Sequence, residues 1–85
     1  MEKLSENYVE ITGYHTDCSL DRRKIASVQR ESNTIAKPGY AGNLQHWLHV
    51  FLESGAHIKI YYADNESNRD DDYREIKEYL VERDN

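Results

Sequence analysis

The sequence has little of what identifies secreted, membrane or disulfide-stapled proteins. It holds one cysteine and one proline, and no apolar run reaches the roughly 18 residues that a membrane span needs. Cys18 has no cysteine to pair with, and its neighbours Asp17 and Asp21 disfavour a reactive thiolate. The N-terminal residues MEKLSENYVE carry acids where a signal peptide needs an apolar stretch. We therefore expect a cytoplasmic protein that does not enter a membrane.

Aliphatic residues are also scarce. Leu, Ile, Val and Phe account for 17 of the 85 residues, close to the roughly 20% below which chains tend to be disordered. Nine aromatic residues, seven of them tyrosine, place the chain on the folded side. The length predicts a single domain over residues 1–85 with a thin core, and a thin core makes self-association plausible.

The net charge of −5 comes from one end of the chain. Residues 1–63 hold seven acids and seven bases, whereas residues 64–85 hold nine acids and four bases. Binding to a nucleic-acid duplex requires several cations on one face, and the only cluster is Arg22-Arg23-Lys24. Direct nucleic-acid binding is therefore not expected.

Alternating apolar and polar residues predict strands. Residues 8–14 form the first, after a tail at 1–7, and residues 15–22 read as a turn region. Residues 24–30 predict a weaker strand, for which a helical turn is the alternative. The strongest pattern lies at residues 47–63, where two alternating runs flank Ser54-Gly55-Ala56 and predict a hairpin with a three-residue loop.

In this hairpin we expect Leu52 to face Ile58, with the pairs Val50 and Ile60 and Leu48 and Tyr62 following, so that one face is wholly apolar. A two-residue loop would mix the faces.

The pattern changes to a helical period after residue 67. Tyr73, Ile76 and Leu80 predict an amphipathic C-terminal helix over residues 68–83, which Ser67 and Asp70 would start as a capping box. Residues 31–46, with two glycine-containing turn signals, are expected to form a long loop that makes contacts.

These elements predict an α+β domain: an antiparallel sheet of about four strands with the C-terminal helix packed on one face. The predicted core consists of Val9, Ile11, Leu48, Val50, Leu52, Ile58, Ile60, Tyr62, Tyr73, Ile76 and Leu80.

The other face of the hairpin is unusually aromatic for a solvent face. It carries Trp47, His49, Phe51, His57, Lys59 and Tyr61. Exposed aromatic patches mark interaction sites, so we expect partner binding at Trp47, His49, Phe51, Lys59 and Tyr61. The alternative is that the long loop or the N-terminal segment covers this face and completes an ordinary core.

Chemistry has little support. The four histidines have no carboxylate or thiolate at a ligand spacing, and an acidic run from Asp64 to Glu75 with calcium-loop spacing has Arg69 where glycine is needed. No nucleophile elbow or phosphate-binding glycine loop is present. We expect no catalytic residue, metal or cofactor.

The order of elements resembles that of small bacterial and phage proteins with a PH-like or related sheet-plus-helix architecture. The resemblance rests on the segments Leu20-Asp21, Ile25–Val28, Ser54-Gly55 and Ile58–Tyr62, followed by a terminal helix. In size and acidity the chain also resembles phage anti-defence inhibitors such as anti-CRISPR proteins. These resemblances imply a fold and a class, and no site residue.

Three functions follow as hypotheses. The first is a non-enzymatic protein-interaction module, a homodimer or higher oligomer, that uses the aromatic face. The second is an inhibitor whose acidic helix blocks a basic nucleic-acid-binding surface on another protein, through Asp70, Asp71, Asp72 and Glu75. The third is a binder of a nucleotide or other small anion, through Arg22, Arg23, Lys24 and Lys37.

Overall fold

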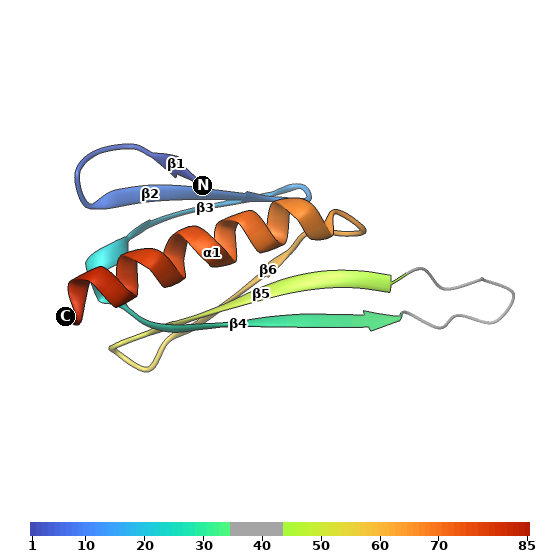
Figure 1. Ribbon diagram of the computed structural model, residues 1–85. Coiled ribbons are helices and arrows are strands. Elements are labelled where there is room, and N and C mark those ends of the chain that lie inside the picture. Colours follow the sequence, from blue (N-terminus) through green and yellow to red (C-terminus); the bar gives the residue numbers. More distant parts are fainter. Residues whose placement is uncertain (35–43) are drawn as a thin grey trace, which may run out of the picture.

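The computed structural model describes residues 1–34 and 44–85, and in these it forms two small sheets and one long helix. The strands are β1 (Glu2–Lys3), β2 (Tyr8–Gly13), β3 (Thr16–Asp21), β4 (Ile25–Thr34), β5 (Leu44–Leu52) and β6 (His57–Tyr61). A 3-10 turn, η1 (Arg22–Lys24), joins β3 to β4, and α1 (Glu66–Arg83) follows β6. The two antiparallel sheets have the orders β1-β2-β3 and β4-β5-β6 (Figure 1).

The α+β class and the C-terminal helix are confirmed, but the single sheet of about four strands is wrong. The chain leaves the first sheet at η1, where the Asp21 side chain accepts a 3.0 Å hydrogen bond from the backbone N–H of Arg23 and also pairs with its guanidinium. This local turn redirects the chain, so that β3 and β4 belong to different sheets. Residues 16–21 fall in the predicted turn region because β3 is polar and shows no apolar alternation, with Leu20 as its one buried apolar residue.

The two sheets meet where β2 ends. The Tyr14 N–H donates a 2.7 Å hydrogen bond to the Tyr61 carbonyl of β6. Gly13 permits this approach, because a Cβ at that position would lie 2.5 Å from the same carbonyl oxygen. The first sheet is thereby fixed to the edge of the second.

The predicted N-terminal tail also has structure. Glu2 and Lys3 pair with Glu10 and Val9 of β2, and the Met1 ammonium reaches the helix. The side chains of this segment are mostly polar and give no strand pattern. The segment is held in place by its pairing with β2 and by the contact of Met1 with α1.

The predicted long loop at 31–46 is wrong at both ends. β4 continues to Thr34 and β5 begins at Leu44, with Glu31 opposite Trp47 and Ser32 opposite His46. The polar composition of these extensions hid them from a hydrophobicity pattern. The rest of the predicted loop, residues 35–43 with Lys37, lies outside the described residues.

The β5–β6 hairpin has the predicted faces and a different register. Leu48 pairs with Ile60 and Val50 with Ile58, two residues away from the predicted pairs. Gly55, with φ of 92°, closes the turn by donating a 2.9 Å hydrogen bond to the Leu52 carbonyl. A shift of two residues keeps every side chain on its face, so the apolar pattern alone does not distinguish these registers.

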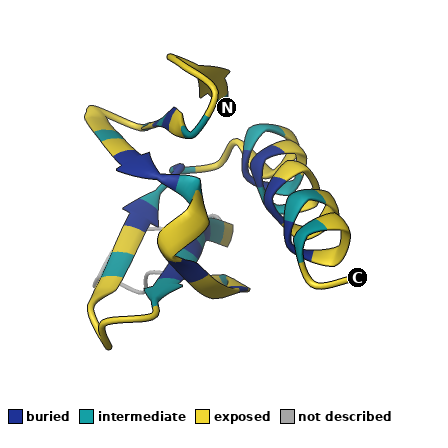
Figure 2. Ribbon diagram, turned by 90° about the vertical axis from the view of Figure 1, so that its left-hand side faces the viewer, coloured by how far each residue is buried: buried dark blue, intermediate teal, exposed yellow. Residues whose placement is uncertain are grey.

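Helix α1 begins two residues before its predicted start. Asn65 is the N-cap and accepts a 3.1 Å hydrogen bond from the Asn68 N–H, so the predicted capping box of Ser67 and Asp70 is wrong. Asparagine is at least as good an N-cap as serine. The helix packs against β4 and β5 with its buried side turned toward the strands (Figure 2).

The core lies between the sheets and α1. Eight of the predicted core residues are buried, and Leu52, Ile58 and Tyr73 are partly buried against them. Sequence reasoning missed Leu20, which lies in the predicted turn region, and Ile25 and Val28, whose alternation is interrupted by a β-bulge between Ile25 and Ser27. The buried apolar residues are Val9, Ile11, Leu20, Ile25, Val28, Leu48, Val50, Ile60, Tyr62, Ile76 and Leu80.

Candidate protein-binding surface

The face of the β4-β5-β6 sheet opposite α1 is the strongest candidate site, and we call it the outer face. It is formed by Glu31 of β4, Trp47, His49 and Phe51 of β5, and His57, Lys59 and Tyr61 of β6. The alternation of β5 places Leu48 and Val50 in the core and directs these odd-numbered residues outward. All five predicted partner-binding residues therefore share one face, as the sequence predicted.

One end of the outer face is a row of aromatic rings. The Trp47 and Tyr61 ring centroids lie 5.3 Å apart, and Tyr14, which follows β2, approaches Tyr61 edge-on at 5.9 Å. The Lys59 ammonium lies 5.1 Å from the Trp47 ring centroid, and the Tyr61 hydroxyl donates to the Gln45 side-chain carbonyl. Trp47 and Tyr61 remain only half-buried, and Tyr14 is 54% exposed.

The other end is built from imidazoles. The Nδ1 atom of His49 lies 2.7 Å from Nε2 of His57, and Nε2 of His49 lies 2.6 Å from a Glu31 carboxylate oxygen. A carboxylate only accepts, so a neutral His49 donates from Nε2 and accepts at Nδ1 from the His57 N–H. The Phe51 ring stacks on His57 with centroids 4.5 Å apart. One N–H thus joins the two imidazoles and a second joins His49 to Glu31, in a single hydrogen-bonded chain.

Glu31 sits between the two ends and balances their charge. The hydrogen bond from His49 lowers the pKa of the Glu31 carboxyl against the opposing effect of burial, and the charge of Lys59, 3.5 Å away, lowers it further. The carboxylate therefore stays ionised and compensates Lys59. The outer face therefore combines aromatic rings with a compensated ion pair and is close to neutral, on a chain whose net charge is −5.

Asp72, which was predicted to belong to an acidic surface, is buried. It is 1% exposed, accepts a 2.7 Å hydrogen bond from the Tyr62 hydroxyl, and forms a 2.6 Å ion pair with the Met1 ammonium. Burial raises the pKa of Tyr62, and Asp72 raises it further. For the Met1 ammonium, burial lowers the pKa, but the hydrogen bond and charge of Asp72 outweigh it and the pKa is raised. Asp72 therefore anchors α1.

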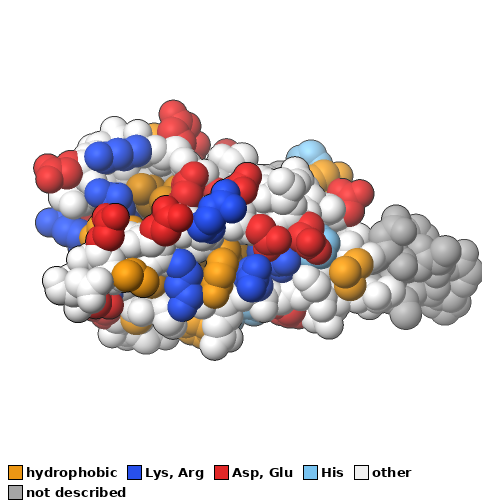
Figure 3. All heavy atoms as spheres, viewed as in Figure 1, with side chains coloured by type: hydrophobic (Ala, Val, Ile, Leu, Met, Phe, Trp, Pro, Cys, Tyr) orange, Lys and Arg blue, Asp and Glu red, His pale blue; other side chains and the backbone are white. Residues whose placement is uncertain are grey.

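The other three predicted acids are compensated on the helix surface. Asp70 accepts a 2.8 Å hydrogen bond from Arg69, Asp71 pairs with Arg74 at 2.7 Å, and Glu75 lies 3.5 Å from the Met1 ammonium. Along α1, basic and acidic side chains alternate rather than form one acidic field (Figure 3).

Two of the predicted anion-binding residues contact other side chains. The Arg22 guanidinium lies 4.3 Å from the Tyr79 ring centroid, and Arg23 pairs with Asp21 at 2.8 Å. Lys24 is exposed at the end of η1, and Lys37 lies outside the described residues.

The surroundings of Cys18 and of the histidines bear on metal binding and on nucleophilic chemistry. Within residues 1–34 and 44–85, no group of three His, Cys, Asp or Glu side chains could hold a metal ion. Burial raises the pKa of the Cys18 thiol, which opposes nucleophilic chemistry. His46 is 3% exposed and lies 2.8 Å from the Ser32 hydroxyl. No helix in the described part of the chain is long and apolar enough to cross a membrane.

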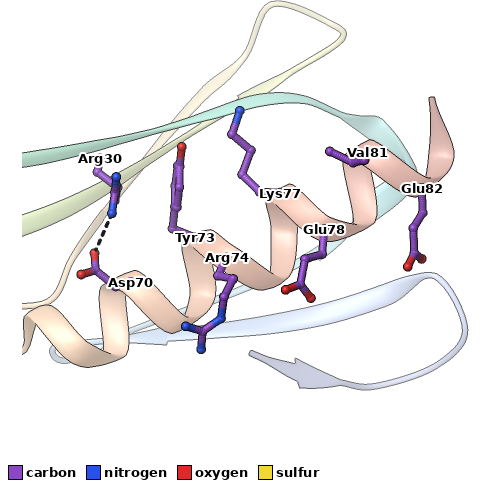
Figure 4. Close-up of a pocket in the computed structure, with 8 residues that line it drawn as sticks. All are labelled: Arg30, Asp70, Tyr73, Arg74, Lys77, Glu78, Val81 and Glu82. Atoms are coloured by element: carbon purple, nitrogen blue, oxygen red, sulfur yellow. Dashed lines mark ion pairs between the residues drawn. The ribbon is translucent and has the colours of Figure 1, made fainter. Parts of the chain in front are cut away.

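Sequence reasoning missed a hollow beside α1. A depression of about 590 Å³ is lined by Arg30 of β4 and by seven helix residues, Asp70, Tyr73, Arg74, Lys77, Glu78, Val81 and Glu82 (Figure 4). The helical periodicity had assigned Tyr73 to the core and the charged residues to solvent. The exposed Val81 was the available signal, since an apolar side chain on the polar side of an amphipathic helix is unusual.

Comparison with known proteins yields no match: no protein-family model, no curated protein and no solved structure is significantly similar to the chain.

Proposed function

We propose that the protein is a non-enzymatic protein-interaction module that self-associates through its outer face. The observation that carries this proposal is the row of rings at Tyr14, Tyr61 and Trp47, continued by Phe51 at the other end of the face. Their contacts with one another fix the rings in place, while Tyr14 stays 54% exposed and Trp47, Phe51 and Tyr61 are only partly buried. Rigid aromatic side chains of this kind dominate the energetics of protein interfaces.

Coverage from within the described chain does not account for the exposed rings. The N-terminal segment pairs with β2 and reaches Asp72, on the α1 side of the fold. Part of the predicted covering loop is the strand extension of β4 and β5 itself. A second molecule is the occupant that we propose for this face.

Charge favours a second copy of the same chain. Two molecules of net charge −5 repel each other, and the repulsion is smallest where the approaching surfaces are neutral. On the outer face, Glu31 and Lys59 compensate each other, and the acids of α1 lie beyond the sheet. A two-fold pairing of outer faces therefore buries rings while it keeps the acidic helices apart.

Sedimentation of the wild type beside a triple variant tests this function. We expect the wild type to sediment as a dimer or larger species, and Trp47→Ala/Phe51→Ala/Tyr61→Ala to sediment as a monomer. A matched control removes exposed apolar side chains elsewhere, with Leu4→Ala/Tyr8→Ala, both about half exposed. A monomeric wild type, or an unchanged mass of the triple variant, contradicts the proposal.

The two other hypotheses have less support. An inhibitor that mimics nucleic acid needs uncompensated acids, and here Asp72 is buried while Asp70 and Asp71 are paired with arginines. An anion binder needs converging cations, and Arg22 and Arg23 are engaged with Tyr79 and Asp21.

A further inference from the structure

We propose that the groove between β4 and α1 binds an extended acidic peptide, which adds to the free edge of β4 as a further strand. We call this the β4 groove and define it by Arg30, Tyr73, Lys77 and Val81. It lies on the α1 side of the sheet, whereas self-association is assigned to the outer face. The two proposals therefore stand or fall separately.

The edge of β4 is open to pairing. Within the described chain, β4 pairs with β5 along one side and has no strand on the other. In an antiparallel sheet every second residue of an edge strand turns its N–H and C=O away from the neighbour, which makes the edge a template for another strand. β4 is a long strand, from Ile25 to Thr34, so it can hold several residues of a peptide.

Helix arginines hold this strand in place. The Arg83 guanidinium donates a 2.8 Å hydrogen bond to the Ile25 carbonyl at the start of β4, and Arg69 donates one of 2.8 Å to the Glu31 carbonyl. Arg69 is 4% exposed. Because both anchors exist before binding, a peptide need not order the edge, and this reduces the entropic cost of association.

The groove provides room for side chains of the added strand. The depression of about 590 Å³ at Arg30, Tyr73 and Lys77 adjoins a second one of about 320 Å³, with which it shares Lys77 and Val81. The second depression extends to Ala26 of β4. Val81 lines both depressions and, at 58% exposure, is the most exposed large apolar side chain among the described residues.

Charge selects an acidic occupant. The Arg30 guanidinium carbon lies 4.4 Å from the Tyr73 ring centroid and the Lys77 ammonium 6.0 Å from it, so two cations flank one ring. Asp70 pairs with Arg30 only loosely, at 3.6 Å. None of the ion pairs formed by the described residues includes Lys77. In Figure 4, Tyr73, Lys77 and Val81 extend on the β4 side of α1, whereas Arg74, Glu78 and Glu82 extend on the other.

The spacing of the two depressions predicts the form of the peptide. Arg30 lines the first depression and Ala26 lines the second, four residues away along β4, where a β-bulge between Ile25 and Ser27 interrupts the alternation of side chains. We expect an Asp or Glu side chain at the Arg30–Lys77 end and an aliphatic side chain about four residues away, over Val81. Backbone pairing supplies affinity, and these two positions supply selectivity.

Selection from random peptides displayed on phage, with the full chain as bait, tests the inference. We expect enrichment of peptides that carry a carboxylate and an aliphatic residue at this spacing. Binding of a synthesised, enriched peptide should weaken about tenfold in Lys77→Glu and in Arg30→Glu. Arg74→Glu is the matched control. Arg74 also lines the first depression, but its side chain extends away from β4, so the same charge change there should alter affinity little.

Two further measurements separate strand addition from general attraction. Two peptides should be compared, each methylated on the backbone nitrogens of one of the two alternating sets of residues. Methylation of the set that faces β4 should abolish binding, and methylation of the other set should spare it. Amide chemical shifts of Val28, Arg30 and Ser32 should move on peptide addition.

The proposal is overturned if no peptide is enriched, if Lys77→Glu binds as tightly as the wild type, or if the shifts map to the outer face. Loss of self-association in Lys77→Glu would instead identify a second copy as the occupant, and would also overturn it.

Discussion

Gly13 lies against the carbonyl of Tyr61 so closely that a Cβ on the glycine would be 2.5 Å from the oxygen and 2.7 Å from the Ile60 side chain. This contact is where the first sheet reaches the edge of the second, beside the hydrogen bond from the Tyr14 N–H. It also sets the position of Tyr14 next to Tyr61 on the outer face. The joint between the sheets therefore contributes to both fold and candidate site.

Replacing Gly13 with alanine should destabilise the fold. The added methyl group meets backbone, which moves less easily than the end of a side chain, and overpacking of this kind costs about 1–3 kcal/mol of unfolding free energy. Urea denaturation measures the loss. Thr12→Ala, an exposed change on the same strand, should stay within about 0.5 kcal/mol. Equal stability of the two variants would mean that the sheets do not meet at Gly13.

Removing the Asp72 carboxylate should cost more than removing any other acid of α1. The change Asp72→Ala leaves the Tyr62 hydroxyl and the Met1 ammonium without their acceptor, and breaking a buried pair typically costs about 3 kcal/mol or more. Asp71→Ala removes a surface pair with Arg74 and should cost less than about 1 kcal/mol. Thermal and urea unfolding of both variants provide the comparison, and similar losses would contradict the anchoring role of Asp72.

Stability should fall in acid through Asp21. The hydrogen bonds from Arg23 lower the pKa of this carboxyl from 3.8 to about 2, despite its burial. A carboxyl whose pKa is lower in the folded state stabilises the protein at pH values above its ordinary pKa. This contribution disappears as the pH falls from about 4 to about 2. We expect Asp21→Asn to be less stable than the wild type at neutral pH and to lose less stability over that interval. Parallel melting curves against pH would contradict the assignment.

Charge balance on the outer face should control self-association. Glu31→Ala leaves Lys59 uncompensated, so that two copies bring like charges together. We expect the dissociation constant of the dimer to rise about tenfold. The double variant Glu31→Ala/Lys59→Ala restores neutrality and should recover much of the wild-type affinity. Sedimentation equilibrium measures all three proteins. If the double variant dissociates as readily as the single one, neutrality is not what favours pairing.

Much of the architecture could be predicted because apolar alternation and helical period are local signals. They placed Leu48 and Val50 on one face of the hairpin and Ile76 and Leu80 on the buried side of α1. They failed on β3, whose residues are largely polar and of which only Leu20 is a buried apolar residue. They also failed on hairpin register, because only turn geometry at Gly55 distinguishes pairings that differ by two residues.

The sequence predicts which aromatic residues form the candidate site, but it does not predict the contacts that these residues make. Alternation alone brings Trp47, Phe51 and Tyr61 to one face. The contacts of Glu31 depend on a strand extension that its polar sequence concealed. The burial of Asp72 was equally hidden, since within a run of three aspartates only a distant partner such as Tyr62 selects which one is buried. The resemblance to PH-like and anti-defence proteins stays a prediction.

The central claim is that two copies meet through their outer faces, and nuclear Overhauser effects between differently labelled chains test it most directly. In an equimolar mixture of isotope-labelled and unlabelled protein, we predict intermolecular signals that join the Trp47 indole and the Tyr61 and Phe51 rings of separate copies. Signals that arise only from α1 or the β4 groove, or none at concentrations where the mass is that of a dimer, would contradict it.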